Sequence, residues 1–84
     1  MRISVISPEQ TLFEGDATSV VAPAYDGELG ILAGHAPLMT LLGRGTLRVM
    51  HGTDERRFDI EGGFLQVVDD VIRVVTEKAR VSAN

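Results

Sequence analysis

Short runs of alternating apolar and polar residues recur along this chain, separated by turn-forming residues. In residues 2–6, Ile3 and Val5 fall on one face of an extended segment. This alternation has the period of a β-strand, in which successive side chains point to opposite faces. The segments that we expect to form strands are residues 2–6, 17–22, 46–50, 56–61, Phe64–Val68 and Val71–Val75.

Turn signals separate these segments at regular intervals. Ser7-Pro8-Glu9 and Pro23 end the first two runs, because proline cannot donate to a ladder. Asp69-Asp70 is expected to form a tight hairpin, and Gly62-Gly63 a bulge or a close backbone approach. The best candidate for a helix, Val71–Ala79, begins with residues that favour a strand. The pattern predicts an all-β sandwich or barrel.

The 84 residues are enough for one hydrophobic core and not for two. We expect a single domain over residues 1–79, followed by a short tail, 80–84. Pro8 and the polar residues around it interrupt any apolar region of a signal peptide, so none is predicted. The most apolar window, Leu29–Leu42, is too short to span a bilayer as a helix, so we predict no direct membrane insertion.

The charge of the chain disfavours nucleic acid as a partner. The formal net charge is −4, and of the eight basic residues only Arg56 and Arg57 are adjacent. An acidic domain of this kind is better suited to a basic protein surface. The absence of cysteine excludes a disulfide framework, a thiolate nucleophile and a zinc–thiolate site.

No group of residues has the pattern of an active site. No serine stands in a G-x-S-x-G context, and His35 and His51 lack metal-ligand spacing. His51 precedes Gly52-Thr53 in a predicted hairpin turn. Asp26 and Glu28 resemble a carboxylate pair but lack the further oxygen donors of a calcium loop, so we interpret them as solvated turn carboxylates.

The segment Gly27–Pro37, with the sequence GELGILAGHAP, is the strongest functional feature. Its glycines and proline predict a shaped loop, formed by Gly27, Gly30, Gly34 and Pro37. The aliphatic residues in and after the loop either all belong to the core or in part face a partner. His35 likewise has two interpretations, a residue that satisfies loop backbone groups or a contact with a partner.

These residues resemble the epsilon subunit of F-type ATP synthases. Gly27–Thr40 (GELGILAGHAPLMT) resembles the central motif of that family. Two other blocks, Val5–Gly15 (VISPEQTLFEG) and Glu61–Val67 (EGGFLQV), resemble family segments in the same order and spacing. The resemblance covers nearly the whole chain.

The resemblance implies a ten-stranded β-sandwich in the central stalk, non-catalytic and without a cofactor. Such a domain binds the gamma subunit and sits on the ring of c subunits, coupling rotation to ATP synthesis. Glu28 matches the acidic position that meets the c-ring, whereas Ser7, His35 and Thr40 match positions against gamma. The implied location is peripheral, at the cytoplasmic face of the bacterial plasma membrane.

The chain departs from the family pattern in two places. Ala33 stands where the family often has proline. After Lys78 only Ala79–Asn84 follow, where most members continue into two helices that can inhibit ATP hydrolysis and in some cases bind ATP. We therefore expect neither an inhibitory element nor ATP binding.

Two other hypotheses stay open at this point. One is a free-standing β-sandwich adaptor that uses the same loop for another protein partner. The other is a small hydrolase or metal-dependent enzyme that uses Asp26, Glu28 and His35.

Overall fold

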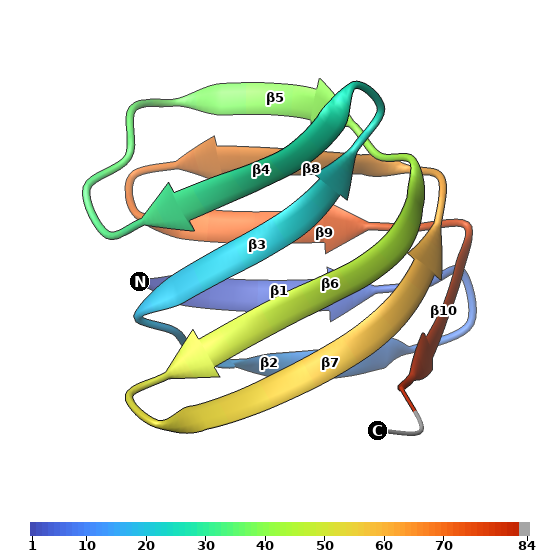
Figure 1. Ribbon diagram of the computed structural model, residues 1–84, viewed down its shortest axis with the longest axis horizontal. Helices are drawn as coiled ribbons and strands as arrows, with labels where there is room; N and C mark the ends of the chain where they lie inside the picture. Colours follow the sequence, from blue (N-terminus) through green and yellow to red (C-terminus); the bar gives the residue numbers. More distant parts are fainter. Residues whose placement is uncertain (83–84) are drawn as a thin grey trace.

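Ten β-strands form two five-stranded sheets that pack face to face (Figure 1). This architecture is seen in a computed structural model that describes residues 1–82. The predicted all-β sandwich is confirmed. In chain order the strands are β1 (Arg2–Ile6), β2 (Thr11–Asp16), β3 (Ser19–Ala24), β4 (Gly27–Leu32), β5 (Leu38–Leu41), β6 (Arg44–His51), β7 (Asp54–Glu61), β8 (Phe64–Val68), β9 (Val71–Val75) and β10 (Lys78–Val81).

The first sheet, sheet I, has the strand order β2-β1-β9-β8-β5. Its neighbours are antiparallel except for β1 and β9, which run parallel, with Arg2 opposite Val71 and Ile6 opposite Val75. The second sheet, sheet II, has the order β10-β7-β6-β3-β4 and is antiparallel throughout. Strands β4 and β5 therefore lie at the edges of different sheets, on the same side of the sandwich (Figure 1).

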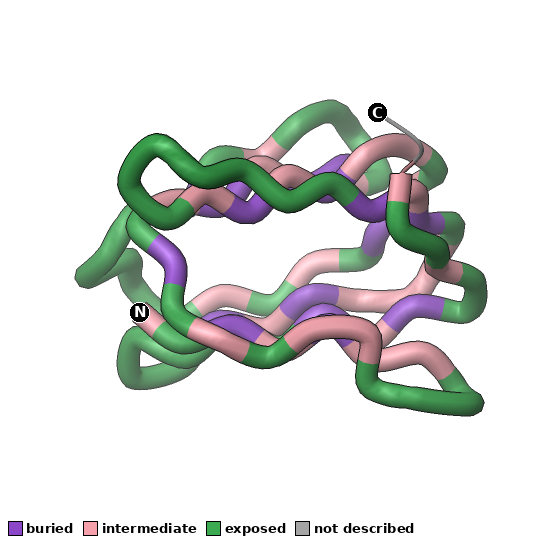
Figure 2. Tube along the Cα trace, turned by 90° about the horizontal axis from the view of Figure 1, so that it is seen from below, coloured by how far each residue is buried: buried purple, intermediate pink, exposed green. Residues whose placement is uncertain are grey.

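The core lies between the two sheets and is made of the inward half of each alternating strand. Figure 2 shows the sandwich edge-on, with buried positions facing the space between the layers. An aromatic pair joins the sheets at one side, where the rings of Phe13 and Phe58 lie 5.8 Å apart. The buried apolar residues of the strands are Ile3, Val5, Leu65, Val67, Ile72 and Val74 in sheet I and Val20, Ala22, Ile31, Leu47, Val49, Phe58 and Ile60 in sheet II.

The six strands predicted from alternation are the six interior strands. The two sheet orders place β2, β4, β5 and β10 at the four edges, and these are the strands that alternation did not predict. An edge strand has one neighbour, so it tolerates glycine and charge that an interior strand does not. Lys78–Val81 is such a strand, and it includes two residues of the expected tail; residues 83 and 84 of that tail lie outside the described residues.

Two predictions about chain breaks were wrong. Residues 27–32 of the expected loop form β4, because all six pair with β3, and Gly30 lies opposite Val21 in that ladder. Pro23 does not end its strand either, since β3 continues to Ala24. The carbonyl oxygen of Pro23 accepts from Gly43 N–H, so the nitrogen of Pro23 also points away from β4, and β6 pairs with β3 only over Ser19–Val21; no ladder bond therefore needs the missing N–H.

The predicted turns are confirmed. Asp69 and Asp70 have φ angles of 49° and 64°, the left-handed values that a tight hairpin requires. The turn after His51 contains Gly52 at a φ of 64°. At Gly63, a Cβ atom would lie 2.0 Å from the carbonyl oxygen of Val75, so the predicted close backbone approach is real. Residues 1–82 contain no helix, and hence no helix that could cross a membrane.

Candidate docking surfaces

Glu28 lies on the free edge of sheet II. Strand β4 pairs only with β3, and Glu28 stands opposite Pro23 in that ladder. Its side chain is exposed, and within residues 1–82 no hydrogen bond or ion pair engages its carboxylate. Glu28 is thus a strand residue rather than a turn residue, with its charge available to a basic group outside the chain.

The four residues predicted to shape the loop differ in backbone conformation and in the space around them. Gly27 and Gly34 have φ angles of 132° and 82°, which side chains larger than glycine rarely adopt. Gly30 has no positive φ, and a Cβ there would meet nothing within 4 Å. Pro37 is exposed directly before β5, the position at which proline interferes least with a ladder.

His35 lies exposed in the segment between β4 and β5. Its backbone N–H donates to the carbonyl oxygen of Leu32 at 3.2 Å, and its Nδ1 lies 2.7 Å from the carbonyl oxygen of Ala36. A carbonyl only accepts, so Nδ1 carries the proton in this contact and the neutral ring presents Nε2 as an acceptor. The side chain therefore satisfies a loop carbonyl and still offers a free nitrogen to solvent or to a partner.

Ser7 and Thr40 are not brought together. Ser7 lies in the β1–β2 turn, where its N–H and its hydroxyl both donate to the carbonyl oxygen of Gln10, at 2.9 and 3.2 Å. Thr40 is half-buried on β5, opposite the buried Leu65, so it points towards the core side of sheet I. Strands β9 and β8 separate β1 from β5, a distance of about 14 Å at the usual strand spacing.

The outward side of sheet I carries apolar residues that sequence reasoning did not single out. We call this surface the outer face of sheet I. Met39 and Leu41, the neighbours of Thr40, are 63% and 64% exposed, and Val68 and Val71 are 42% and 41% exposed. The half-buried residues Phe64, Val75 and Ile6 continue the row that starts at Leu41 across β8, β9 and β1.

The aliphatic residues of the central segment divide between core and surface. Ile31 and Leu42 are buried, whereas Leu32, Met39 and Leu41 are exposed. The interpretation that some of them are available to a partner is therefore the better one. The signal was present in the sequence: the period of two within 38–41 places Met39 and Leu41 on one face, opposite to Thr40.

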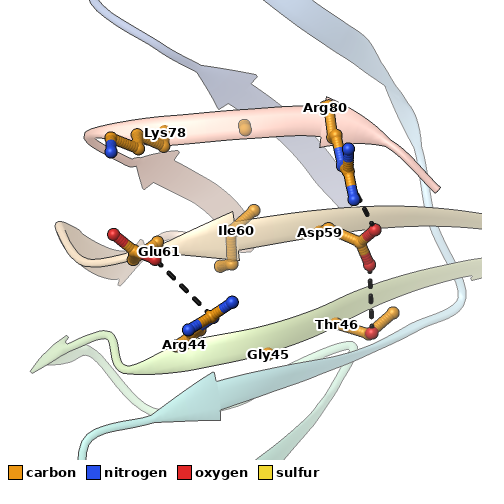
Figure 3. Close-up of a pocket in the computed structure, with 9 residues that line it drawn as sticks. Arg44, Gly45, Thr46, Asp59, Ile60, Glu61, Lys78 and Arg80 are labelled. Atoms are coloured by element: carbon orange, nitrogen blue, oxygen red, sulfur yellow. Dashed lines mark hydrogen bonds and ion pairs between the residues drawn. The ribbon is translucent and has the colours of Figure 1, made fainter.

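A hollow on the outward side of sheet II contains charged residues that are largely paired with one another (Figure 3). Asp59 accepts from the Thr46 hydroxyl at 3.3 Å through Oδ1, and its Oδ2 lies 3.6 Å from Nε of Arg80. Arg44 Nε and Glu61 Oε1 are also 3.6 Å apart. The Asp59 carboxylate beside the Thr46 hydroxyl is thus also engaged by Arg80, so the charged groups of the hollow serve one another.

The carboxylates and histidines do not form a metal site within the described range. Across residues 1–82, no three His, Cys, Asp or Glu side chains gather closely enough to hold a metal ion. Asp26, Glu28 and His35 are all exposed, on the β3–β4 turn, on β4 and on the segment after β4. They do not meet as the hypothesis of a metal-dependent enzyme requires.

Known proteins resemble this chain over almost all of its length. Residues 1–82 match the family described as ATP synthase, Delta/Epsilon chain, beta-sandwich domain. The ATP synthase epsilon chain of Solibacter usitatus is 44% identical over 79 residues, which are 94% of this chain and 59% of that protein. The epsilon chain of Frankia casuarinae is 41% identical over 83 residues, 98% of each chain. The chain thus spans about 60% of some relatives and nearly the whole of others.

Solved structures share the fold. A chain of the Euglena gracilis mitochondrial ATP synthase, in a structure of OSCP, F1 and c-ring, superposes with a TM-score of 0.87 at 26% identity. The match covers 94% of this chain and 51% of that one. A chain of the central stalk and c-ring of the Tetrahymena thermophila mitochondrial ATP synthase gives a TM-score of 0.79 at 15% identity, over 94% and 64% of the two chains.

Proposed function

Since this chain belongs to the ATP synthase epsilon family, we propose that it docks the gamma subunit to the c-ring and couples rotation to ATP synthesis. It is a non-catalytic part of the ATP synthase complex, in the central stalk. We place it peripherally, at the cytoplasmic face of the bacterial plasma membrane. The observation that supports the proposal is the presence of two different exposed surfaces, the outer face of sheet I and the free edge at Glu28, on one close-packed sandwich.

The outer face of sheet I is suited to gamma. Met39, Leu41, Val68 and Val71 expose apolar side chains on neighbouring strands, with Gln66 and Arg73 between them on the same face. An apolar surface of this kind on a small domain is typical of a protein–protein interface. Thr40 lies on β5 between Met39 and Leu41 but is turned to the core side, and His35 lies on the segment before β5.

The edge of sheet II is suited to the c-ring. Glu28 offers an exposed carboxylate without a partner in the described chain, on a strand whose outer edge is free. A basic loop of the c subunits would complement this charge, and such complementarity sets orientation and specificity more than affinity. Ser7 directly follows Ile6, the last residue of the row that crosses the outer face of sheet I, so the proposed contact of gamma with Ser7 would extend that surface to the β1–β2 turn.

The sandwich between the two surfaces is suited to transmitting torque. The inward faces of both sheets are close to completely buried, and within residues 1–82 no buried side-chain polar atom lacks a hydrogen-bond partner. A close-packed interior of this kind has low compressibility. A force applied at the outer face of sheet I is therefore passed to β4 with little deformation.

Co-purification tests this function. The tagged chain is expressed with gamma and the c-ring of the same host, and we expect a complex that contains all three. A Leu41→Glu variant serves as control, since a charge on the outer face of sheet I should release gamma. Recovery of a gamma–c-ring complex that never contains the tagged wild-type chain would contradict the proposal.

A further inference from the structure

The β4–β5 segment is fastened to a hairpin turn on the other sheet. The backbone N–H of Gly34 donates to Oδ1 of Asp70 at 2.8 Å, although the two residues are 36 positions apart. Asp70 lies in the turn between β8 and β9, at the end of the molecule where β4 leads towards β5 (Figure 1). One carboxylate thus connects the segment after β4 of sheet II to a hairpin of sheet I.

The turn that holds Asp70 is itself well anchored. Val68 and Val71 pair across the hairpin, and Asp69 and Asp70 both adopt left-handed φ angles between them. The carbonyl oxygen of Asp70 also accepts from the backbone N–H of Arg2 at 3.1 Å, which fixes the turn to β1. The turn that carries the Asp70 carboxylate is therefore held in place by three strands, β8, β9 and β1.

The segment itself has few other restraints. His35 N–H bonds to Leu32, and His35 Nδ1 bonds to Ala36, but both contacts are local. In the portion of the chain that the structure describes, Asp70 supplies the one hydrogen bond from residues 33–37 to a distant element. Gly34 has a φ of 82°, and because glycine adopts left-handed and right-handed conformations about equally readily, its own backbone does not restrict the segment to this one.

We propose that Asp70 is a positioning residue, which holds Gly34 and thereby sets the place from which His35 meets gamma. The first half of this inference, that Asp70 holds Gly34, stands on the structure alone. The second half, that this sets the place from which His35 meets gamma, rests on the proposed function. A loop ordered before it binds loses less conformational entropy on association. Asp70 acts through Gly34 and need not touch the partner itself.

Three variants separate the hydrogen bond from other effects of the turn. Asp70→Gly removes the carboxylate but keeps the hairpin, because Asp-Gly is a favoured sequence for left-handed turns. Asp70→Asn keeps an acceptor oxygen but loses the charge, which matters because Oδ2 lies 3.9 Å from the Met1 amino nitrogen. Asp69→Gly is the matched control, with the same change one residue earlier in the turn.

Amide hydrogen exchange of the isolated 84-residue chain, read by NMR, tests the first half. In Asp70→Gly the Gly34 amide should exchange about tenfold faster, the effect expected from losing a charge-assisted hydrogen bond. The amides of β8 and β9 should keep their rates, Asp70→Asn should restore most of the protection, and Asp69→Gly should leave Gly34 unchanged. Equal Gly34 rates in Asp70→Gly and wild type would overturn the proposed tether.

The affinity for gamma tests the second half. We expect Asp70→Gly to bind gamma about fivefold more weakly, and Asp70→Asn and Asp69→Gly to bind like wild type. Faster Gly34 exchange with unchanged affinity would overturn the positioning role. If the wild-type chain did not bind gamma at all, the proposed function would fail, and the exchange rates would still decide whether Asp70 holds the loop.

Discussion

The hydroxyl of Thr76 donates to the carbonyl oxygen of Gly62 at 2.8 Å, from a residue that is 2% exposed. The carbonyls of Lys78 and Glu61 lie within 2.9 and 3.3 Å of the same oxygen. Thr76 therefore joins the β7–β8 turn to the β9–β10 connection, and so joins two of the places where the chain passes between the sheets.

Thr76→Val should destabilise the domain, because valine keeps the shape and leaves a buried carbonyl without its donor. We expect the free energy of unfolding to fall by about 1–2 kcal/mol. Urea denaturation followed by circular dichroism measures this change. Thr76→Ser retains the hydroxyl and is the control; if valine and serine cost the same, the hydrogen bond is not the cause.

Gly63→Ala should be among the most damaging single substitutions. The new Cβ would lie 2.0 Å from the Val75 oxygen, at a φ of 99° that alanine rarely adopts. We expect a loss of more than about 3 kcal/mol in the free energy of unfolding, or failure to fold. Gly30→Ala is the matched control, since its Cβ meets nothing within 4 Å, and it should be neutral or stabilise by about 0.5 kcal/mol. Similar losses at both sites would contradict the packing described for Gly63.

Glu28→Lys should leave the isolated domain folded and impair coupling in the assembled enzyme. The side chain is exposed, so the free energy of unfolding should change by less than about 0.5 kcal/mol. In membrane vesicles, ATP-driven proton pumping should fall relative to ATP hydrolysis, because under the proposed function the new positive charge would face a basic loop of the c-ring. Asp26→Lys, on the preceding turn, is the control. Unfolding by Glu28→Lys would instead assign Glu28 a structural role.

Leu41→Glu should weaken gamma binding without unfolding the chain. Leu41 is 64% exposed on the outer face of sheet I, so a charge there costs little in the free chain. We expect the affinity for gamma to fall at least about tenfold, as measured by calorimetry. Val81→Glu changes an equally exposed aliphatic residue on β10, at the edge of sheet II, and should have no effect. Unchanged affinity in Leu41→Glu would remove the outer face of sheet I from the interface.

The sequence predicted the interior of the sandwich better than its rim. Alternation located β1 and β9 because interior strands bury one face on a regular period. Alternation did not predict the edge strand β4, because Gly27 and Gly30 are typical of loops, although the ladder with β3 holds both in a strand. Alternation did not predict β10 either, because it is a short edge strand in which Lys78 and Arg80 are exposed to solvent.

The candidate site was also predicted only in part, because the sequence does not show how distant segments are placed in space. The resemblance supplied Glu28, His35 and Thr40 as residues, but it could not say that Thr40 turns towards the core side. The tether from Asp70 to Gly34 spans 36 positions and depends on a left-handed turn. Contacts of that range follow from tertiary packing, which local propensity and spacing do not encode.

The parallel pairing of β1 with β9 has a consequence for how the chain folds as it is made. β1 lies between β2 and β9, so one of its edges stays unpaired until the segment that ends at Val75 has been synthesised. Pairings this distant in sequence are slow to form, because a long loop must close first. A nascent chain that stops before β9 therefore exposes a free strand edge, and the first sheet can be completed only when nearly all of the domain has left the ribosome.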